Sequence, residues 1–267
     1  MYHAYWGLRE TPFRDSLEPR CFFRNPTHDE ALARLDFLVQ QQRRLGLLQG
    51  ASGSGKSLVL GVFASGAAGA GHVVAKMSLA AIDVPEWLAQ LATQLRTWPD
   101  RQDGTATLWR RITDRLRELR YENRSAVALF DDVHDASSGV LGHVMRLVRW
   151  SPEADSRLTI VVVADAQRLG RLGRDLLERV ELRIDLEPWE PADTAAFVQA
   201  SLRLAGRDAP LFDGPALAKL HELTHGIPRR VSQLADLALM AGAGRHVQRI
   251  DADLVESVYY ELGVVQV

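Results

Sequence analysis

The chain has 267 residues, and its share of hydrophobic residues (46%) and of charged residues (25%) is typical of a globular protein with one sizeable core and a small second domain. A formal net charge of −2 argues against a strongly basic nucleic-acid-binding protein, although it leaves room for a local basic patch. The single cysteine, Cys21, excludes a disulfide framework and a cysteine-based metal site. We find neither a signal peptide nor a membrane-spanning apolar run, and therefore expect a cytoplasmic protein with no transmembrane segment.

The N-terminal residues 1–26 are rich in aromatic side chains and proline, which predicts an extended arm packed on the domain that follows. Thr27 and Glu30 have the spacing of a capping box and predict a helix that continues to about Gln42. We therefore assign residues 1–43 to an N-terminal arm and helix packed on the core domain. In a nucleotide-binding protein such a lead-in often lines the base pocket, and a plain packing arm is the alternative.

A glycine-rich turn then separates a short apolar strand, predicted over 44–49, from a helix. Successive backbone N–H groups can point into one concavity only where side chains are small and φ is free. The start of the helix adds unpaired N–H groups and the positive end of its dipole. The turn therefore predicts a phosphate-binding loop, formed by Gly50, Ala51, Ser52, Gly53, Ser54, Gly55, Lys56, Ser57 and Leu58.

Two residues give this loop its chemistry. Lys56 can reach the β- and γ-phosphates of a nucleotide, and the hydroxyl of Ser57 can bind Mg²⁺. The alternative, a Gly/Ser-rich surface turn, does not require a lysine followed by a serine. Lysine is also scarce in this chain, occurring only as Lys56, Lys76 and Lys219.

The next predicted elements are a second strand over 72–78 and a helix that begins after Asp83, with Pro85 in its first turn. A further helix is predicted over 105–121. One face of it is apolar, and the other carries Arg110, Arg111, Arg115, Arg117 and Arg120 beside Asp114 and Glu118. We interpret that charged face as a solvated surface; the alternative is a contact for nucleic acid or a neighbouring subunit.

The apolar strand predicted over 125–130 ends in two carboxylates, Asp131 and Asp132. Paired acids at the tip of a buried strand need a cation to match them. A Mg²⁺ ion bound to nucleotide phosphates supplies one: Asp131 would hold the ion through water, and Asp132 would face the attacking water as general base or orienter. The alternative is a strand followed by an Asp-rich turn.

A helix over 138–149 precedes a nearly all-apolar strand over 158–165, as expected when both faces of a sheet are covered. Asp165 lies at its carboxyl tip, where an open α/β sheet binds its ligand. A short helix over 170–178 leads to Arg179, and a strand over 180–186 follows.

Pro188 and Pro191 mark a domain boundary, after which the strand signal disappears. Helices are predicted over 192–205, 214–223, 229–243 and 251–261. Residues 44–188 thus form a nucleotide-binding α/β domain with a parallel, doubly wound sheet, and residues 189–267 a small helical lid. Arg229 stands at the start of the third lid helix, where it is either a functional cation or simple surface charge.

These motifs resemble the AAA+ ATPases, specifically the ExeA-type ATPase of the general secretion pathway. The resemblance covers nearly the whole chain and includes the N-terminal segments Tyr5–Phe13, Pro19–Phe23 and His28–Leu32. In this family the phosphate loop is the Walker A motif, and Phe130-Asp131-Asp132 corresponds to Walker B. The resemblance makes Arg179 an arginine-finger candidate and places Arg229 in the sensor-2 motif.

The resemblance implies a parallel sheet sandwiched between helices, followed by an all-helical lid, with Mg-ATP bound between the two domains. It implies hydrolysis of ATP, assembly of copies of the chain into a ring or filament, and an unidentified protein partner. The core also resembles the ATPase helpers of transposition, which load on DNA.

The chain departs from the family pattern at three points. Asp132 replaces the usual glutamate and is one methylene shorter, although some related initiator ATPases with Asp-Asp hydrolyse ATP. Asp165 occupies the sensor-1 position, where an amide or hydroxyl is usual, and an ionised carboxylate cannot donate a hydrogen bond. The transmembrane segment and cell-wall-binding domain of long members have no counterpart in the sequence. Two alternatives to an efficient ATPase therefore remain: a nucleotide-gated switch with little hydrolysis, and an ATP-dependent DNA-loading helper.

Overall fold

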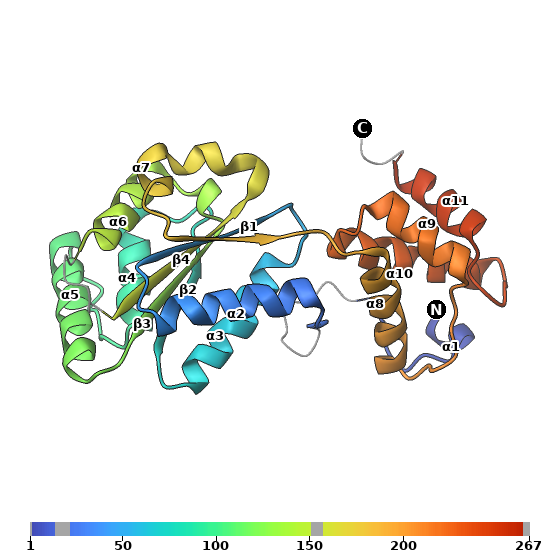
Figure 1. Cartoon of the computed structure of the whole chain (residues 1–267), viewed down its shortest axis with the longest axis horizontal. Helices are drawn as coiled ribbons and strands as arrows, with labels where there is room; N and C mark the ends of the chain where they lie inside the picture. The colour runs from blue at the N-terminus through green and yellow to red at the C-terminus, as the bar shows by residue number, and fades with distance from the viewer. Residues whose placement is uncertain (1, 14–21, 151–156, 264–267) are drawn as a thin grey trace. The chain divides into compact units, whose positions relative to one another are not determined.

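The computed structural model describes residues 2–13, 22–150 and 157–263 (Figure 1). Pro19–Cys21 of the N-terminal signature lie outside the described residues. By its internal contacts the chain divides into two compact units. The sheet unit ends at Leu186, and the C-terminal unit runs from Glu187 onward and also includes the N-terminal segment and Gly53–Gly55.

The sheet unit contains a five-stranded parallel sheet in the order β2-β3-β4-β1-β5. Its strands are β1 (Leu45–Gly50), β2 (Val73–Ser78), β3 (Ala126–Asp131), β4 (Leu158–Asp165) and β5 (Leu182–Leu186). In the register of the sheet Gly50 lies opposite Asp165, and Ser78 lies opposite Asp131. The predicted phosphate loop and all the predicted acidic strand tips therefore meet at one edge of the sheet.

Helices cover both faces of this sheet, which confirms the predicted α/β sandwich (Figure 1). One core lies against α4 (Val84–Gln94), α5 (Thr105–Tyr121) and α6 (Ser138–Val148); the other lies against α2 (Pro26–Gln40) and α3 (Lys56–Gly69). Successive strand residues point to opposite faces, so Leu47 is buried in the first core and Leu48 in the second. This burial on both sides explains the continuous apolar run of β4.

The start of α2 differs from the prediction. The side chain of Asn25 accepts a 2.9 Å hydrogen bond from the backbone N–H of His28, and Pro26 occupies the first turn. The predicted capping box of Thr27 and Glu30 is therefore wrong. Proline is favoured at the first helical position because its missing N–H would be unpaired there, so the cap lies just before it.

One further helix prediction was wrong in detail. The expected single helix over 170–178 is a 3₁₀ segment, η3 (Ala166–Leu172), followed by α7 (Arg174–Leu177). Gly173 separates the two with φ of 79°, a conformation that a helix cannot contain.

The C-terminal unit is helical, as predicted. It contains α8 (Pro191–Leu204), α9 (Gly214–Thr224), α10 (Pro228–Gly244) and α11 (Ala252–Gly263). None of the helices in the described part of the chain combines the length and apolar character that crossing a bilayer requires.

The N-terminal segment belongs to this unit. It begins with the helix α1 (Tyr2–Trp6), not an extended arm. The indole of Trp6 is 2% exposed, and its N–H donates a 2.8 Å hydrogen bond to the carbonyl of Leu239 in α10. The backbone N–H of Arg9 likewise donates to the carbonyl of Ala205. The expectation that all of residues 1–43 pack on the sheet domain is thus wrong for this segment, because its large aromatic surface is buried against the C-terminal helices.

Candidate nucleotide-binding site

The predicted phosphate loop lies between β1 and α3. Residues 51–55 are neither strand nor helix, and α3 begins at Lys56, with Ser57 and Leu58 in its first turn. Gly53 and Gly55 have φ of 81° and 93°, which residues with a side chain rarely adopt. The glycines at these two positions are thus required by the backbone of the loop, and that backbone suits a phosphate.

Lys56 folds back over the start of the same loop. Its ammonium donates hydrogen bonds of 2.9 Å to the carbonyl of Gly50 and 2.7 Å to the carbonyl of Ala51. These contacts hold the cationic end of the side chain within the loop, at the carboxyl end of β1. A bound phosphate chain in the loop would therefore meet a positive charge that is already in place.

Ser57 and Asp131 come together across the gap between α3 and β3. The Ser57 hydroxyl donates a hydrogen bond to the Asp131 carboxylate, which is 7% exposed. Burial raises the pKa of Asp131 above its ordinary value, and the negative charge of Asp132 adds to this increase. The Ser57 bond, the Asp132 N–H and the charge of Lys76 oppose it.

A hydroxyl and a carboxylate side by side are the oxygen ligands that Mg²⁺ accepts when it also binds nucleotide phosphates. Within the described residues, no group of three or more His, Cys, Asp or Glu side chains could hold a metal ion. The donor set therefore fits a magnesium ion that shares its coordination with phosphate and water, and does not fit an all-protein metal site.

Asp132 follows immediately and turns the chain sharply. Its φ of 52° is left-handed, and its backbone N–H donates a 2.9 Å hydrogen bond to Oδ1 of Asp131. Its own carboxylate accepts a 2.9 Å hydrogen bond from the hydroxyl of Ser78, at the tip of β2. The two predicted acids thus face different partners, which suits the different roles proposed for them.

Asp165 lies at the tip of β4, opposite Gly50. Its Oδ1 accepts a 2.9 Å hydrogen bond from the backbone N–H of Gln167, so the side chain caps η3. Its backbone N–H donates to Nδ1 of His134 at 3.3 Å. Asp165 therefore lies at the strand tip, where the sequence placed it, and its carboxylate already has a structural partner. Its role toward a nucleotide stays a prediction.

The two candidate arginines differ in their relation to the phosphate loop. Arg179 is exposed in the turn between α7 and β5. Arg229 is exposed in the first turn of α10, and its backbone N–H donates a 3.2 Å hydrogen bond to the carbonyl of Gly53 in the loop. Their roles toward a bound nucleotide stay predictions.

The arginine-rich face of α5 is largely neutralised by ion pairs. Arg111 contacts Asp103 at 2.7 Å, and Arg117 contacts Asp114 at 2.7 Å. Arg115 contacts both Glu118 and Glu122 at 3.0 Å. These pairs favour our interpretation of a solvated face over a dedicated nucleic-acid contact.

Sequence reasoning missed Ser78 and His134. Both touch predicted site residues, but Ser78 lies 54 positions from Asp132 and His134 lies 31 positions from Asp165. The only signal available was position: Ser78 ends a predicted strand, and His134 follows the paired acids. Their contacts depend on strand order, which the sequence pattern did not reveal.

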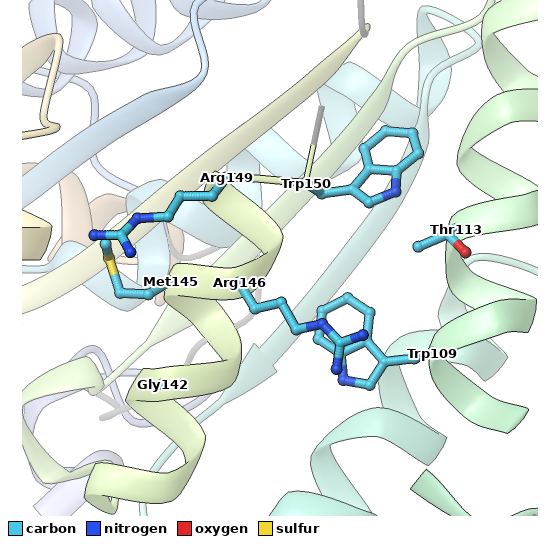
Figure 2. A pocket seen from close by; sticks show the side chains of 7 residues that line it. All are labelled: Trp109, Thr113, Gly142, Met145, Arg146, Arg149 and Trp150. Atoms are coloured by element: carbon cyan, nitrogen blue, oxygen red, sulfur yellow. The ribbon is translucent and has the colours of Figure 1, made fainter. Parts of the chain in front are cut away.

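A cavity of about 440 Å³ lies elsewhere on the sheet unit, between α5 and α6 (Figure 2). It is lined by Trp109, Thr113, Gly142, Met145, Arg146, Arg149 and Trp150, none of which is a predicted site residue. The Arg146 guanidinium lies 4.4 Å from the centre of the Trp109 ring, a cation–π contact visible in Figure 2.

The comparisons with known proteins bear on the fold and the family resemblance. No protein-family model matches the chain. The chain is 28% identical over 271 residues to general secretion pathway protein A of Aeromonas hydrophila, an alignment that covers 98% of this chain. It spans 48%, about half, of the length of that protein.

Solved structures match across nearly the full chain. The ORC2 protein of Aeropyrum pernix matches with a TM-score of 0.69 and 16% identity, covering 94% of this chain and 71% of that one. The ORC1 protein of the same organism, solved in complex with DNA, matches with a TM-score of 0.65 and 17% identity, covering 96% of this chain and 69% of that one. The chain has the AAA+ fold.

The RuvB Holliday junction branch migration motor of Thermotoga maritima also matches, with a TM-score of 0.61 and 15% identity, over 95% of this chain and 74% of that one. The predicted AAA+ fold is thus confirmed, and so is the similarity to the secretion-pathway protein. Because the structural likenesses have low sequence identity, they establish the fold alone.

Proposed function

We propose that this AAA+ protein binds Mg-ATP at the strand tips of the sheet unit and hydrolyses the ATP to drive assembly or remodelling of a partner protein. The contact between Ser57 and Asp131, beside the loop that holds Lys56, is the observation that carries this proposal. The buried carboxylate of Asp131, whose pKa is raised, would gain a matching positive charge from Mg²⁺ bound beside the Ser57 hydroxyl and the phosphate loop.

Each group of residues has its own role in the proposed site. The loop amides and Lys56 hold the phosphates, and Ser57 and Asp131 would hold Mg²⁺. When bound, the ion would supply neutralisation of the phosphate charge. Asp132 orients the attacking water, and the hydrogen bond from Ser78 holds its carboxylate in one direction for that role. Hydrolysis by this machinery is a matter of positioning and charge, with no covalent intermediate.

The two arginines complete the proposed site. Arg229 is assigned to the γ-phosphate. Arg179, exposed ahead of β5, reaches the nucleotide of a neighbouring copy, so the protein works as a ring or filament. We place it in the cytoplasm, where ATP is available, and propose a partner in the secretion pathway on the strength of the 28% identity.

The experiment compares two lysine variants. Lys56→Ala should reduce ATP binding and steady-state turnover to background, because it removes the ammonium held by Gly50 and Ala51. Lys219→Ala is the matched control: Lys219 lies on α9 and pairs with Glu222 at 2.9 Å. Undiminished turnover in Lys56→Ala would refute the proposal.

A nucleotide-gated switch with little hydrolysis is the second candidate. Two observations favour it. Asp132 is shorter than the glutamate that is usual in the family the sequence resembles, and the carboxylate of Asp165 already accepts a hydrogen bond from the Gln167 N–H. Measuring ATP affinity beside turnover decides between the two. Tight binding with turnover at background selects the switch, and a brisk steady rate excludes it.

A DNA-loading role is the third candidate, and the solved structures give it a reason. The ORC1 protein of Aeropyrum pernix was solved in complex with DNA. Binding to duplex DNA that requires ATP and weakens steeply as salt rises would support the role. No binding at low salt would exclude it.

A further inference from the structure

A buried histidine connects the segments that follow β3 and β4. His134 lies in the 3₁₀ turn η2 (Val133–Asp135), directly after the paired acids, and is 7% exposed. Its Nδ1 accepts a 3.3 Å hydrogen bond from the backbone N–H of Asp165. Its Nε2 lies 3.4 Å from Oδ2 of Asp135.

These contacts define the tautomer of the neutral ring. An imidazole nitrogen that accepts from a backbone N–H carries no proton, so in the neutral ring the proton is on Nε2. The carboxylate of Asp135, 3.4 Å from Nε2, favours a proton on that nitrogen. The histidine therefore uses both nitrogens, one toward each neighbour, in a single tautomer.

Asp135 is itself anchored from the other segment. Arg168 and Arg171, both in η3, place guanidinium nitrogens 3.1 Å and 3.2 Å from its carboxylate. Hydrogen bonding by Arg168 holds the pKa of Asp135 below its ordinary value, so this carboxylate stays ionised at neutral pH. The η2 and η3 segments are thus joined twice, by the ion pairs and by His134.

The His134 link lies beyond the point where β3 and β4 stop pairing. The backbone ladder between β3 and β4 ends at the pair of Phe130 and Val162. Beyond that pair, β4 continues to Asp165 along β1 alone. The imidazole therefore reconnects the two strands three residues farther on, at the edge of the sheet where the candidate site lies.

We propose that His134 is a positioning residue that sets the spacing between Asp132 and the tip of β4 beside the phosphate loop. The inference rests on the proposed ATP hydrolysis. Asp132 moves with η2, because the N–H of Asp135 donates a 2.9 Å hydrogen bond to its carbonyl. Asp165 lies opposite Gly50, so the histidine ties the water-orienting acid to the strand that carries the loop.

Two substitutions test the contacts of the two ring nitrogens of His134 separately. His134→Asn retains an acceptor near the place of Nδ1 and keeps the bond to Asp165. His134→Gln retains a donor near the place of Nε2 and keeps only the contact with Asp135. Losing the link to Asp165 removes one buried hydrogen bond, so we expect His134→Gln to lower kcat about tenfold. His134→Asn should stay within about threefold of the wild type.

Binding of ATP should not change in either variant, because the phosphate loop is built by β1 and α3. A second readout needs no nucleotide: hydrogen exchange at the Asp165 amide should be slow in the wild type and in His134→Asn, and at least about tenfold faster in His134→Gln. His246→Gln, at an exposed histidine of the C-terminal unit, is the control.

The inference fails if His134→Gln keeps wild-type kcat and slow exchange at Asp165, or if both variants lose kcat and exchange protection equally. Failure of the proposed function looks different: wild-type turnover would then equal that of Lys56→Ala, and both proposals would fall together. Wild-type turnover with an unaffected His134→Gln removes only the positioning role.

Discussion

Ser78 and Asp132 are joined across the tips of two neighbouring strands by a 2.9 Å hydrogen bond, which the serine hydroxyl donates to Oδ2 of the carboxylate. In the sheet register Ser78 lies opposite Asp131, so the bond reaches one residue past the end of the ladder. Asp132 has left-handed backbone geometry at this point. The bond therefore fixes the direction of a short side chain that the chain turn alone would leave free.

Removing the serine hydroxyl should slow hydrolysis. We expect Ser78→Ala to lower kcat about tenfold with ATP affinity unchanged, because a hydrogen bond to an ionised group contributes about 1.5–3 kcal/mol and here orients the acid. Ser78→Thr keeps the hydroxyl and should retain most of the rate. Steady-state turnover of both variants tests this, and a faster Ser78→Ala would mean that the serine restrains Asp132.

Asp131 predicts a particular pH dependence of stability in the metal-free, nucleotide-free protein. Its pKa is raised by burial, so between its unfolded and folded values the native state holds more protons than the unfolded state. Stability contributed by this group is therefore lost as pH rises through that window. The free energy of unfolding falls by up to about 1.4 kcal/mol per pH unit where the native state holds one proton more than the unfolded state.

Asp131→Asn removes this titration while it keeps the shape of the side chain. Denaturant unfolding of both proteins in EDTA should give stabilities that approach each other at low pH and diverge as pH rises, with the asparagine variant more stable near neutral pH. The same variant should lose the effect of Mg²⁺ on ATP affinity. A wild-type protein that gains stability relative to Asp131→Asn as pH rises would contradict the assignment.

The proposed role of Arg179 predicts complementation between two inactive proteins. Arg179→Ala has an intact phosphate loop, and Lys56→Ala has an intact arginine. Because the arginine acts on the nucleotide of a neighbouring copy, an equimolar mixture should turn over ATP faster than the two proteins measured separately. Arg174→Ala is the control: its side chain is 89% exposed and pairs with Glu178. Additive rates in the mixture would exclude an arginine acting between copies.

The N-terminal cap of α2 offers a test of stability alone. Asn25→Ala should destabilise the protein by about 1 kcal/mol, because the helix loses the acceptor of the His28 N–H. Thr27→Ala should change stability by less than about 0.5 kcal/mol, because Thr27 lies inside the helix and not at its cap. Equal losses in the two variants, measured by denaturant unfolding, would show that Thr27 also caps the helix.

Local patterns were sufficient for the main elements of the fold. The predicted bounds of α5 (Thr105–Tyr121) and β4 (Leu158–Asp165) match the structure, because helical periodicity and a continuous apolar run depend on neighbouring residues. The phosphate loop was equally local, since glycine, lysine and serine in that spacing meet the needs of one turn. The resemblance to AAA+ ATPases was carried by these same short motifs.

By itself, then, the sequence determined the class of sheet, the loop and the acids at the strand tips. The tertiary structure decided which side chains meet those acids: Ser78 at Asp132, and His134 at the backbone of Asp165. It also decided that Trp6 is buried against α10 and not against the sheet. The two residues of each contact are separated in the sequence by 54, 31 and 233 positions, respectively. Such contacts depend on strand order and helix packing, which no local pattern contains.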